Sequence, residues 1–328
     1  MKSICYLVPY FGKLPKGFEM WLLSCKANPT INWCLITDDR TPYDYPKNFI
    51  VKYCTYDEVK QRIQNHFDFP VYISKPWKLC DFRPAYGEIF AEELKGFDFW
   101  GHCDMDLVFG NIRKFYTDSV LEKYEKIGFQ GHSGLYKNTP EVNSRYKTIL
   151  ENCPDYREVF ASGDGQFFDE VGICKIYDAI GIPYFNDTVF AHIDRFTSSF
   201  YLLYLPEEDK FKNHRQVFVW DNGNMIRYYL AGDQVESEEF MYLHTFSRPI
   251  VFKAQAYDLK TKYVIYPDVL TELKCDKPSV KFISRKGRCS TLEFYCKIAW
   301  AYRKKLTLKK IIYYLKRKAN LAAKRGFN

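Results

Sequence analysis

The chain has 328 residues, 47% of them hydrophobic and 18% aromatic, which allows a sizeable core and excludes a disordered protein. Its net charge of +8 is concentrated at one end: residues 293–328 hold eleven Lys or Arg against one Glu, whereas residues 1–292 hold 37 basic and 39 acidic side chains. A nearly neutral body argues against nucleic-acid binding and for a cationic appendage. Eleven Cys without a CxxC pair indicate free thiols, and no apolar run reaches the roughly 18 residues of a membrane span.

Short apolar strands alternate with helical segments at the start of the chain. The expected elements are a helix at 18–25 and strands at 4–10, 33–37 and 49–54. This alternation predicts an α/β fold with a mixed, mostly parallel sheet flanked by helices. Ligands of such sheets bind beyond the carboxyl ends of the strands, where Tyr10, Asp38 and Asp39 stand. For Asp38 and Asp39 the alternative to a ligand contact, a turn and helix N-cap, stays equally open.

Asp104 and Asp106 form the first candidate site. They end an aromatic strand that begins near Phe97, and Gly110 interrupts the apolar run that follows. Strand alternation points both carboxylates the same way, with Met105 opposite. Two carboxylates at the carboxyl end of a buried strand suit Mg²⁺ or Mn²⁺, which can hold a departing diphosphate. The alternative is a pair of Asp that faces water.

Charged residues precede this strand. Lys78 and Arg83 can meet a diphosphate, and Asp81 can order them or contact a sugar hydroxyl. Each of the three singly also fits a charged helix start, because a helix is expected from Tyr86 to Leu94. After Gly110, a further helix is expected at 112–126.

Two stretches that are interrupted by glycines follow. Residues 129–134 read as a strand in which His132 can touch substrate, although a lone His is more often structural. Asp164 lies between two glycines at what we expect to be the entry to a helix. There it can bind an acceptor hydroxyl or act as a general base, or it can simply cap the helix.

The region from 217 to 255 offers a third metal ligand. Asp221-Asn222-Gly223 is a hairpin turn signal within 217–229. A short strand then ends at His244, which can supply imidazole to a metal, and Arg248 can clamp a phosphate. Short strands and loops are expected at 251–290.

The basic tail reads as helical, in two pieces around Thr307. One face carries the apolar residues Leu308, Ile311, Ile312, Leu315, Ala319 and Ala322, and basic side chains cover the other. Trp300, Tyr302, Tyr313 and Tyr314 add aromatic rings. The pattern is typical of a helix in an anionic membrane interface. The alternative is a helix docked on the body with a solvated basic face.

Taken in order, these motifs resemble the GT-A class of nucleotide-sugar glycosyltransferases. The resemblance spans about residues 1–255, and its most specific parts are Asp104-Met105-Asp106 and Leu243-His244. It is greatest for bacterial polysaccharide transferases of the capsule, exopolysaccharide or O-antigen type, with a layout similar to glycogenin and the lipooligosaccharide galactosyltransferases. In this chain Thr-Phe-Ser-Arg follows Leu243-His244 where the family has a Gly-Lys arrangement, and Asp164-Gly-Gln166 replaces a plain Asp-Gln pair.

The resemblance implies a hexosyltransferase that uses a UDP-sugar and Mn²⁺ or Mg²⁺ and acts on a lipid-linked oligosaccharide at the cytoplasmic face of a bacterial membrane. The implied metal ligands are Asp104, Asp106 and His244. The implied donor contacts are Tyr10, Asp38, Asp39, Lys78, Asp81, Arg83, Asp104, Gln166 and Arg248, with Lys253 as another phosphate contact. The implied acceptor contacts are His132 and Asp164. Asp106 and Asp164 are implied to be catalytic, with Asp164 the base if the reaction inverts and a stabiliser of the oxocarbenium-like centre if it retains.

The implied organisation is a catalytic domain at 1–255, an extension packed on it at 256–292, and a membrane-association tail at 293–328. Two other functions remain open. A phosphohydrolase with the same carboxylates normally needs more His and Asp ligands for two metals, and the chain has six His. A non-catalytic adaptor would use only the basic tail. The sequence leaves the sugar, the linkage and the oligomeric state open.

Overall fold

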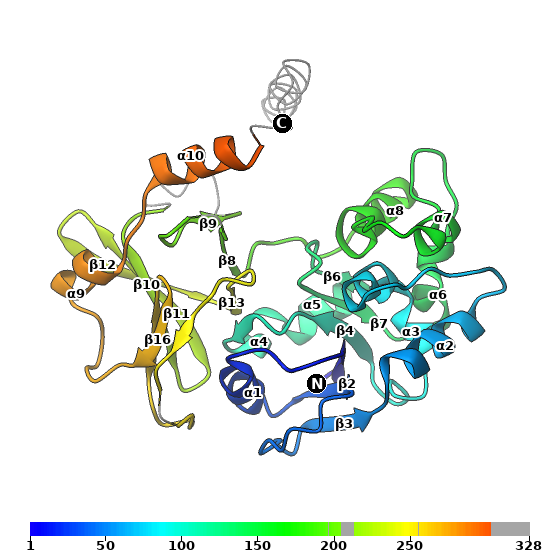
Figure 1. The fold of residues 1–328 in the computed structure, drawn as a ribbon, viewed down its shortest axis with the longest axis horizontal. Coiled ribbons are helices and arrows are strands. Elements are labelled where there is room, and N and C mark those ends of the chain that lie inside the picture. Colours follow the sequence, from blue (N-terminus) through cyan, green and yellow to red (C-terminus); the bar gives the residue numbers. More distant parts are fainter. Residues whose placement is uncertain (196, 205–212, 255, 303–328) are drawn as a thin grey trace.

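A computed structural model describes residues 1–195, 197–204, 213–254 and 256–302. Within these ranges the chain is a mixed α/β protein with three mixed sheets, which confirms the expected class at that level. In Figure 1 the first sheet lies on the right, the sheet that contains β10 to β12 lies on the left, and β8, β9 and β13 lie between them. The amphipathic face expected at 308–322 falls outside the described residues.

The first sheet has the strand order β3-β2-β1-β4-β7-β6. Its strands are β1 (Ile4–Tyr10), β2 (Ile31–Thr37), β3 (Phe49–Tyr53), β4 (Phe99–Cys103), β6 (Lys126–Ile127) and β7 (Ser133–Lys137). β3, β2, β1 and β4 run parallel, whereas β7 pairs antiparallel with β4 and with β6. The carboxyl ends of the four parallel strands therefore meet at one edge, as ligand-binding α/β sheets require.

Both faces of this sheet are buried. Along β1, Cys5 and Leu7 join one apolar cluster, whereas Ile4, Tyr6 and Val8 join the other. The helices that pack here are α1 (Phe18–Lys26), α2 (Tyr56–His66), α3 (Tyr86–Ile89), α4 (Ile112–Phe115), α5 (Asp118–Lys123), α6 (Pro140–Asn143), α7 (Tyr156–Ala161) and α8 (Ile173–Ile180). A sheet covered on both sides explains why its strands read as continuous apolar runs.

Three expected elements differ in the structure. The helix expected at Tyr86–Leu94 ends at Ile89 and follows a 3₁₀ helix, η1 (Pro76–Ala85). The single helix expected at 112–126 is two helices, because Thr117 accepts a hydrogen bond from Val120 N–H and starts α5. The strand expected at 129–134 begins only at Ser133.

Two further sheets complete the molecule. One has the order β5-β13-β8-β9, formed by β5 (Leu107–Phe109), β8 (Ala191–Ile193), β9 (Leu202–Leu203) and β13 (Tyr242–His244). The other has the order β12-β11-β10-β15-β16-β14, formed by β10 (Gln216–Asp221), β11 (Asn224–Ala231), β12 (Gln234–Phe240), β14 (Val251–Phe252), β15 (Tyr263–Tyr266) and β16 (Val269–Glu272). The expected hairpin is confirmed: Asn222 and Gly223 join β10 to β11 with φ values of 45° and 82°, as a two-residue turn needs.

The segment 256–292 takes part in this last sheet, because β15 pairs with β10. It continues through α9 (Val280–Lys286) to α10 (Thr291–Tyr302), where the expected basic tail begins. Along α10, Leu292, Tyr295 and Trp300 expose most of their side chains. None of the helices in the described ranges has the length and apolar character that crossing a bilayer demands.

Candidate active site

The carboxylates of Asp104 and Asp106 lie at the carboxyl end of β4, at the sheet edge where ligands bind. The peptide N–H of Asp104 donates to His132 O at 2.9 Å, which continues the β4–β7 pairing past the end of the strand. The carbonyl oxygen of Asp106 accepts from Thr245 N–H at 3.0 Å, and its carboxylate accepts from Ser247 N–H at 2.5 Å. The backbone on both sides thus fixes the direction of the two side chains.

A strand pairing brings His244 to the aspartates. β5 directly follows Asp106 and pairs antiparallel with β13, with Leu107 opposite His244. His244 Nε2 therefore lies 3.3 Å from Asp106 Oδ1. Gly110 makes this pairing possible, because a Cβ there would lie 2.7 Å from Phe240 O and 2.8 Å from Met225 N.

Asp104, Asp106 and His244 offer a ligand set for a divalent cation. One ligand atom from each lies within 4.8 Å of the others. Two carboxylates and one imidazole suit Mn²⁺, and leave coordination positions for phosphate oxygens or water. These residues are the three metal ligands that the resemblance implies, and their donor chemistry fits that assignment.

Arg83, at the end of η1, joins two carboxylates. Its guanidinium pairs with Asp104 and with Asp169, whose Oδ2 lies 2.9 Å from Arg83 Nη1. The same Nη1 donates to Gly131 O at 2.5 Å. Asp169 belongs to η3 (Phe168–Gly172). Arg83 thus ties η1, η3 and the end of β4 together at the site.

The three acidic side chains titrate differently. Burial raises the pKa of Asp104, and the Asp106 carboxylate adds to the shift. Burial also acts to raise the pKa of Asp106, but the bonds from His244 and from Ser247 N–H outweigh it, and the pKa is lowered. Burial raises the pKa of Asp169 to about 7. Neighbouring carboxylates whose pKa values move apart are common at catalytic sites.

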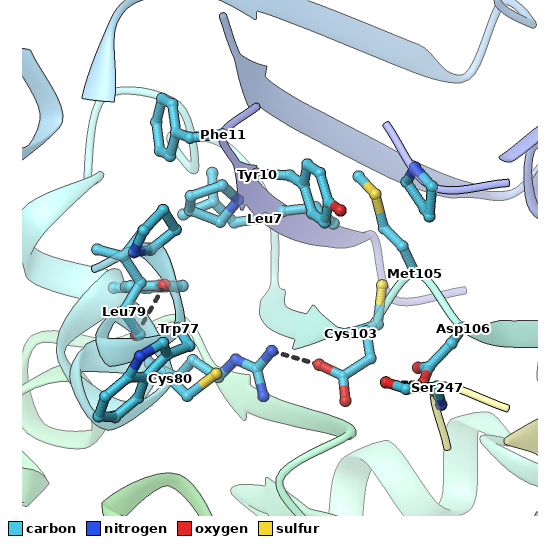
Figure 2. A pocket seen from close by; sticks show the side chains of 17 residues that line it. Leu7, Tyr10, Phe11, Trp77, Leu79, Cys80, Cys103, Met105, Asp106 and Ser247 are labelled. Atoms are coloured by element: carbon cyan, nitrogen blue, oxygen red, sulfur yellow. Dashed lines mark hydrogen bonds and ion pairs between the residues drawn. The ribbon is translucent and has the colours of Figure 1, made fainter. Parts of the chain in front are cut away.

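One cavity of about 460 Å³ opens between the ends of β1 and β4. Figure 2 shows Tyr10 and Phe11 at the end of β1, with Trp77 across the cavity and with Asp106 and Ser247 together at the far side. Pro9 and Pro15 add apolar surface. The cavity therefore offers aromatic and apolar walls that lead to the carboxylates.

A second cavity of about 470 Å³ opens on the other side of Arg83, Asp104 and Asp106. It is lined by three histidines, His132, His192 and His244, whose nearest ring nitrogens also lie within 4.8 Å of one another. Burial lowers the pKa of His132 well below its usual value and that of His192 to about 3. Both rings are therefore neutral at pH 7. Among the described residues, Nε2 of His132 and Nε2 of His192 have no hydrogen-bond partner.

Several residues expected at the donor support the site from outside. Lys78 is fully buried and donates to Asp81, Val159 O and Asp164 O, which occupies its three N–H groups. Asp81 lines the second cavity, but its oxygens accept from the N–H groups of Gln166 and Phe168. This pair therefore anchors the 164–168 loop, and Lys78 has no N–H left for a phosphate.

Asp38 and Asp39 hold the loop after β1. Asp38 accepts from Gly12 N–H at 2.7 Å, and Asp39 accepts from Leu14 N–H at 2.9 Å. Hydrogen bonds from the Thr41 hydroxyl and from backbone N–H groups lower the pKa of Asp39 to about 2. Neither side chain lines the cavities beside the aspartates.

Four other residues expected at the site do not line either of the two cavities. Asp164 and Gln166 are exposed on the loop before η3, and neither lines the two cavities. Arg248 is buried, bonds to Asp268 and Asp194 O, and borders a third cavity that Asp106 also lines. Lys253 is exposed beyond it.

The sequence motifs did not single out Asp169, His192 and Tyr204, which line the second cavity. Asp169 stands five residues after Asp164, in the same acidic and aromatic stretch, so its position offered a signal. His192 lies in β8, which pairs with β13 and sets His192 opposite His244. That pairing joins distant segments, and the local sequence around His192 gives no sign of it.

Comparisons with known proteins identify a matching family model and similar solved structures. A family model described as a family of unknown function (DUF6625) matches residues 6–274. No curated protein matches. Among solved structures, the chain is similar to the glycosyltransferase GlyE of Streptococcus pneumoniae TIGR4, with 10% sequence identity and a TM-score of 0.30, over 57% of this chain and 45% of that one. At this level the similarity to GlyE carries no inference about the present chain.

Proposed function

We propose a function for this chain, which belongs to the family of unknown function DUF6625, from the chemistry of its aspartate–histidine site. The chain is a metal-dependent hexosyltransferase that takes a hexose from a UDP-sugar and transfers it to a lipid-linked saccharide. One observation carries the proposal: Asp104, Asp106 and His244 converge between two cavities, so a donor and an acceptor can meet at a single cation.

The cavity beside β1 is assigned to the nucleotide. Tyr10 and Phe11 provide aromatic surface for a base, and the cavity leads directly to Asp104 and Asp106. A bound Mn²⁺ or Mg²⁺ supplies positive charge to the departing diphosphate. Arg83 is the one Lys or Arg of the described residues that lines both cavities, and it adds a fixed positive charge at their junction.

In the reaction, the bond between C1 of the hexose and the diphosphate oxygen breaks, and C1 bonds to an acceptor oxygen. The acceptor hydroxyl gives up its proton to a base. Asp169 is our candidate for that base, because it lines the second cavity and its pKa of about 7 suits proton transfer near neutral pH. Asp164, which the resemblance implies, is exposed outside that lining.

Isothermal titration of UDP with and without Mn²⁺ tests the proposal. We expect the wild-type chain to bind UDP only with Mn²⁺, and Asp106→Ala to lose this binding. Asp233→Ala removes an exposed Asp in the β11–β12 turn and serves as the matched control. UDP binding that is equal in Asp106→Ala and wild type, at equal folded content, would defeat the proposal.

A two-metal phosphohydrolase is the second candidate, and the three-histidine group favours it. His132, His192 and His244 offer ligand atoms for an ion next to the one at the aspartates. Two-metal hydrolases hold their ions about 4 Å apart. Metal content of the protein dialysed against Mn²⁺ separates the two: one ion per chain supports the transferase, and two ions together with phosphate release from UDP support the hydrolase.

We propose that residues 293–328 bind a membrane surface. Leu292, Tyr295 and Trp300 along α10 are exposed, and the sequence beyond 302 is strongly basic. Apolar contact together with cationic charge favours an anionic lipid surface. Deleting residues 303–328 is expected to abolish sedimentation with phosphatidylglycerol vesicles and to leave UDP binding intact. A chain that binds vesicles but never UDP would instead be an adaptor.

A further inference from the structure

The second cavity has an aromatic rim to which the proposed reaction gives no role. Trp77, Phe167 and Tyr204 line it, although 50%, 64% and 45% of their respective surfaces are exposed. Phe246 lines it as well, with its ring 4.8 Å from that of His192. Large aromatic side chains normally bury most of their surface. Four of them around one cavity indicate a ligand that covers them.

The backbone holds three of these rings in place at some cost. Phe167, Tyr204 and Phe246 have φ values of 53°, 61° and 51°, a conformation that bulky side chains rarely adopt. Such strain tends to persist at ligand sites. Trp77 lies against the 164–168 loop, because a Cβ on Gly165 would come within 3.0 Å of its ring.

The charges of the cavity select the kind of ligand. Its lining includes five carboxyl groups, those of Asp81, Asp104, Asp106, Asp169 and Glu170, and Arg83 is the one Lys or Arg of the described residues among them. Lys78 pairs with Asp81, and the Arg195 guanidinium lies 4.9 Å from the centre of the Phe246 ring, so the acidic groups still outnumber the nearby cations. These groups therefore repel an anionic ligand, except where a bound cation lies next to it. Hydroxyl groups, by contrast, donate readily to carboxylate oxygens.

We propose that Trp77, Phe167, Tyr204 and Phe246 form the platform for the acceptor saccharide, and that the acceptor presents a neutral hexose there. The apolar C–H face of the sugar ring stacks on the aromatic rings, and its hydroxyls donate to the carboxylates. The role as acceptor site rests on the proposed transferase function. Hexose binding itself requires neither metal nor nucleotide, so it can be measured independently.

Saturation-transfer NMR on the full chain, without metal or nucleotide, tests the platform. The probes are methyl β-D-glucopyranoside, methyl β-D-galactopyranoside and the negatively charged methyl β-D-glucuronide. We expect signal from the neutral glycosides and none from the glucuronide. Trp77→Ala and Phe167→Gly are expected to weaken binding of the neutral glycosides by about tenfold or more. Glycine adopts the positive φ at position 167 without steric strain, which offsets its entropic cost, so Phe167→Gly removes the ring with little expected effect on folding.

Tyr72→Ala is the matched control, because Tyr72 is an equally exposed aromatic against the same loop, at Gly163, but does not line the cavity. It should bind the probes as wild type does. Absence of signal from every neutral glycoside, signal retained in both Trp77→Ala and Phe167→Gly, or equal binding of the glucuronide would each overturn the platform. UDP–Mn²⁺ binding of wild type and Phe167→Gly shows whether the donor site holds independently of the platform. Trp77→Ala is left out of this comparison, because Trp77 also lines the first cavity.

Discussion

His244 Nε2 lies 3.3 Å from Asp106 Oδ1, although the two residues are 138 positions apart in the chain. The antiparallel pairing of β5 with β13 holds them there, with Leu107 opposite His244. The third candidate ligand thus comes from a small sheet that lies between the first sheet and the sheet of β10, β11 and β12 (Figure 1). Perturbing either strand is expected to disturb the site.

Replacing His244 by Ala tests its role as a ligand. The carboxylates of Asp104 and Asp106 remain, so Mn²⁺ should still bind, but more than about tenfold more weakly. Titration of Mn²⁺ followed by electron paramagnetic resonance measures this affinity. His66→Ala, which removes a His paired with Glu88 away from the site, should leave the affinity unchanged. Equal affinities in the two variants would remove His244 from the ligand set.

Arg83 compensates two buried carboxylates at once. Arg83→Met leaves Asp104 and Asp169 without their cation, and we expect the free energy of unfolding to fall by about 3 kcal/mol or more. Adding Asp169→Asn should restore part of this loss, because Asn needs neither a nearby cation nor an extra bound proton in the buried site. Urea unfolding at pH 7 gives both values. A double variant no more stable than Arg83→Met would contradict this account of the cluster.

Asp169 makes stability depend on pH. Burial raises its pKa from 3.8 to about 7, so the folded state keeps a proton that the unfolded chain releases near pH 4. The free energy of unfolding therefore decreases as pH rises between these two values, by at most about 1.4 kcal/mol per pH unit from this group. Asp169→Asn lacks this contribution. Urea unfolding from pH 4.5 to 7.5 should show wild type losing stability relative to the variant, and a constant difference would rule the shift out.

Gly110 affects both the stability of the fold and the geometry of the candidate metal site. In Gly110→Ala the new Cβ meets the backbone of Phe240 and Met225, which cannot move aside as a flexible side chain does. We expect the free energy of unfolding to fall by about 1–3 kcal/mol. Mn²⁺ binding should also weaken, because a shift at Gly110 moves β5, which pairs with the strand that carries His244. Gly163→Ala is the control, since the three atoms nearest to its Cβ all belong to the exposed Tyr72 ring. Thermal unfolding and Mn²⁺ titration measure the two effects, and wild-type values for Gly110→Ala would contradict the packing argument.

Local patterns predicted the elements whose signals are local. β1 matches its expected bounds, and the Asn222–Gly223 hairpin follows from turn chemistry alone. The pair Asp104 and Asp106 stands out because strand alternation and a following glycine are visible in the sequence. Lys78 and Asp81 show the limit of this reasoning: their charges suggested a ligand, but they bond to each other and to the 164–168 loop. His192 and Tyr204 join the site only through pairing of β8 with β13 and β9, or through loop packing, which no local pattern encodes.

The most direct measurement of the central claim is anomalous diffraction at the manganese edge from crystals of the full chain soaked with Mn²⁺ and UDP. We expect one strong anomalous peak bonded to Asp104, Asp106 and His244, with the diphosphate beside it and the uracil against Tyr10 in the cavity at the end of β1. A manganese peak elsewhere, or UDP bound with both aspartates free of metal, would contradict it.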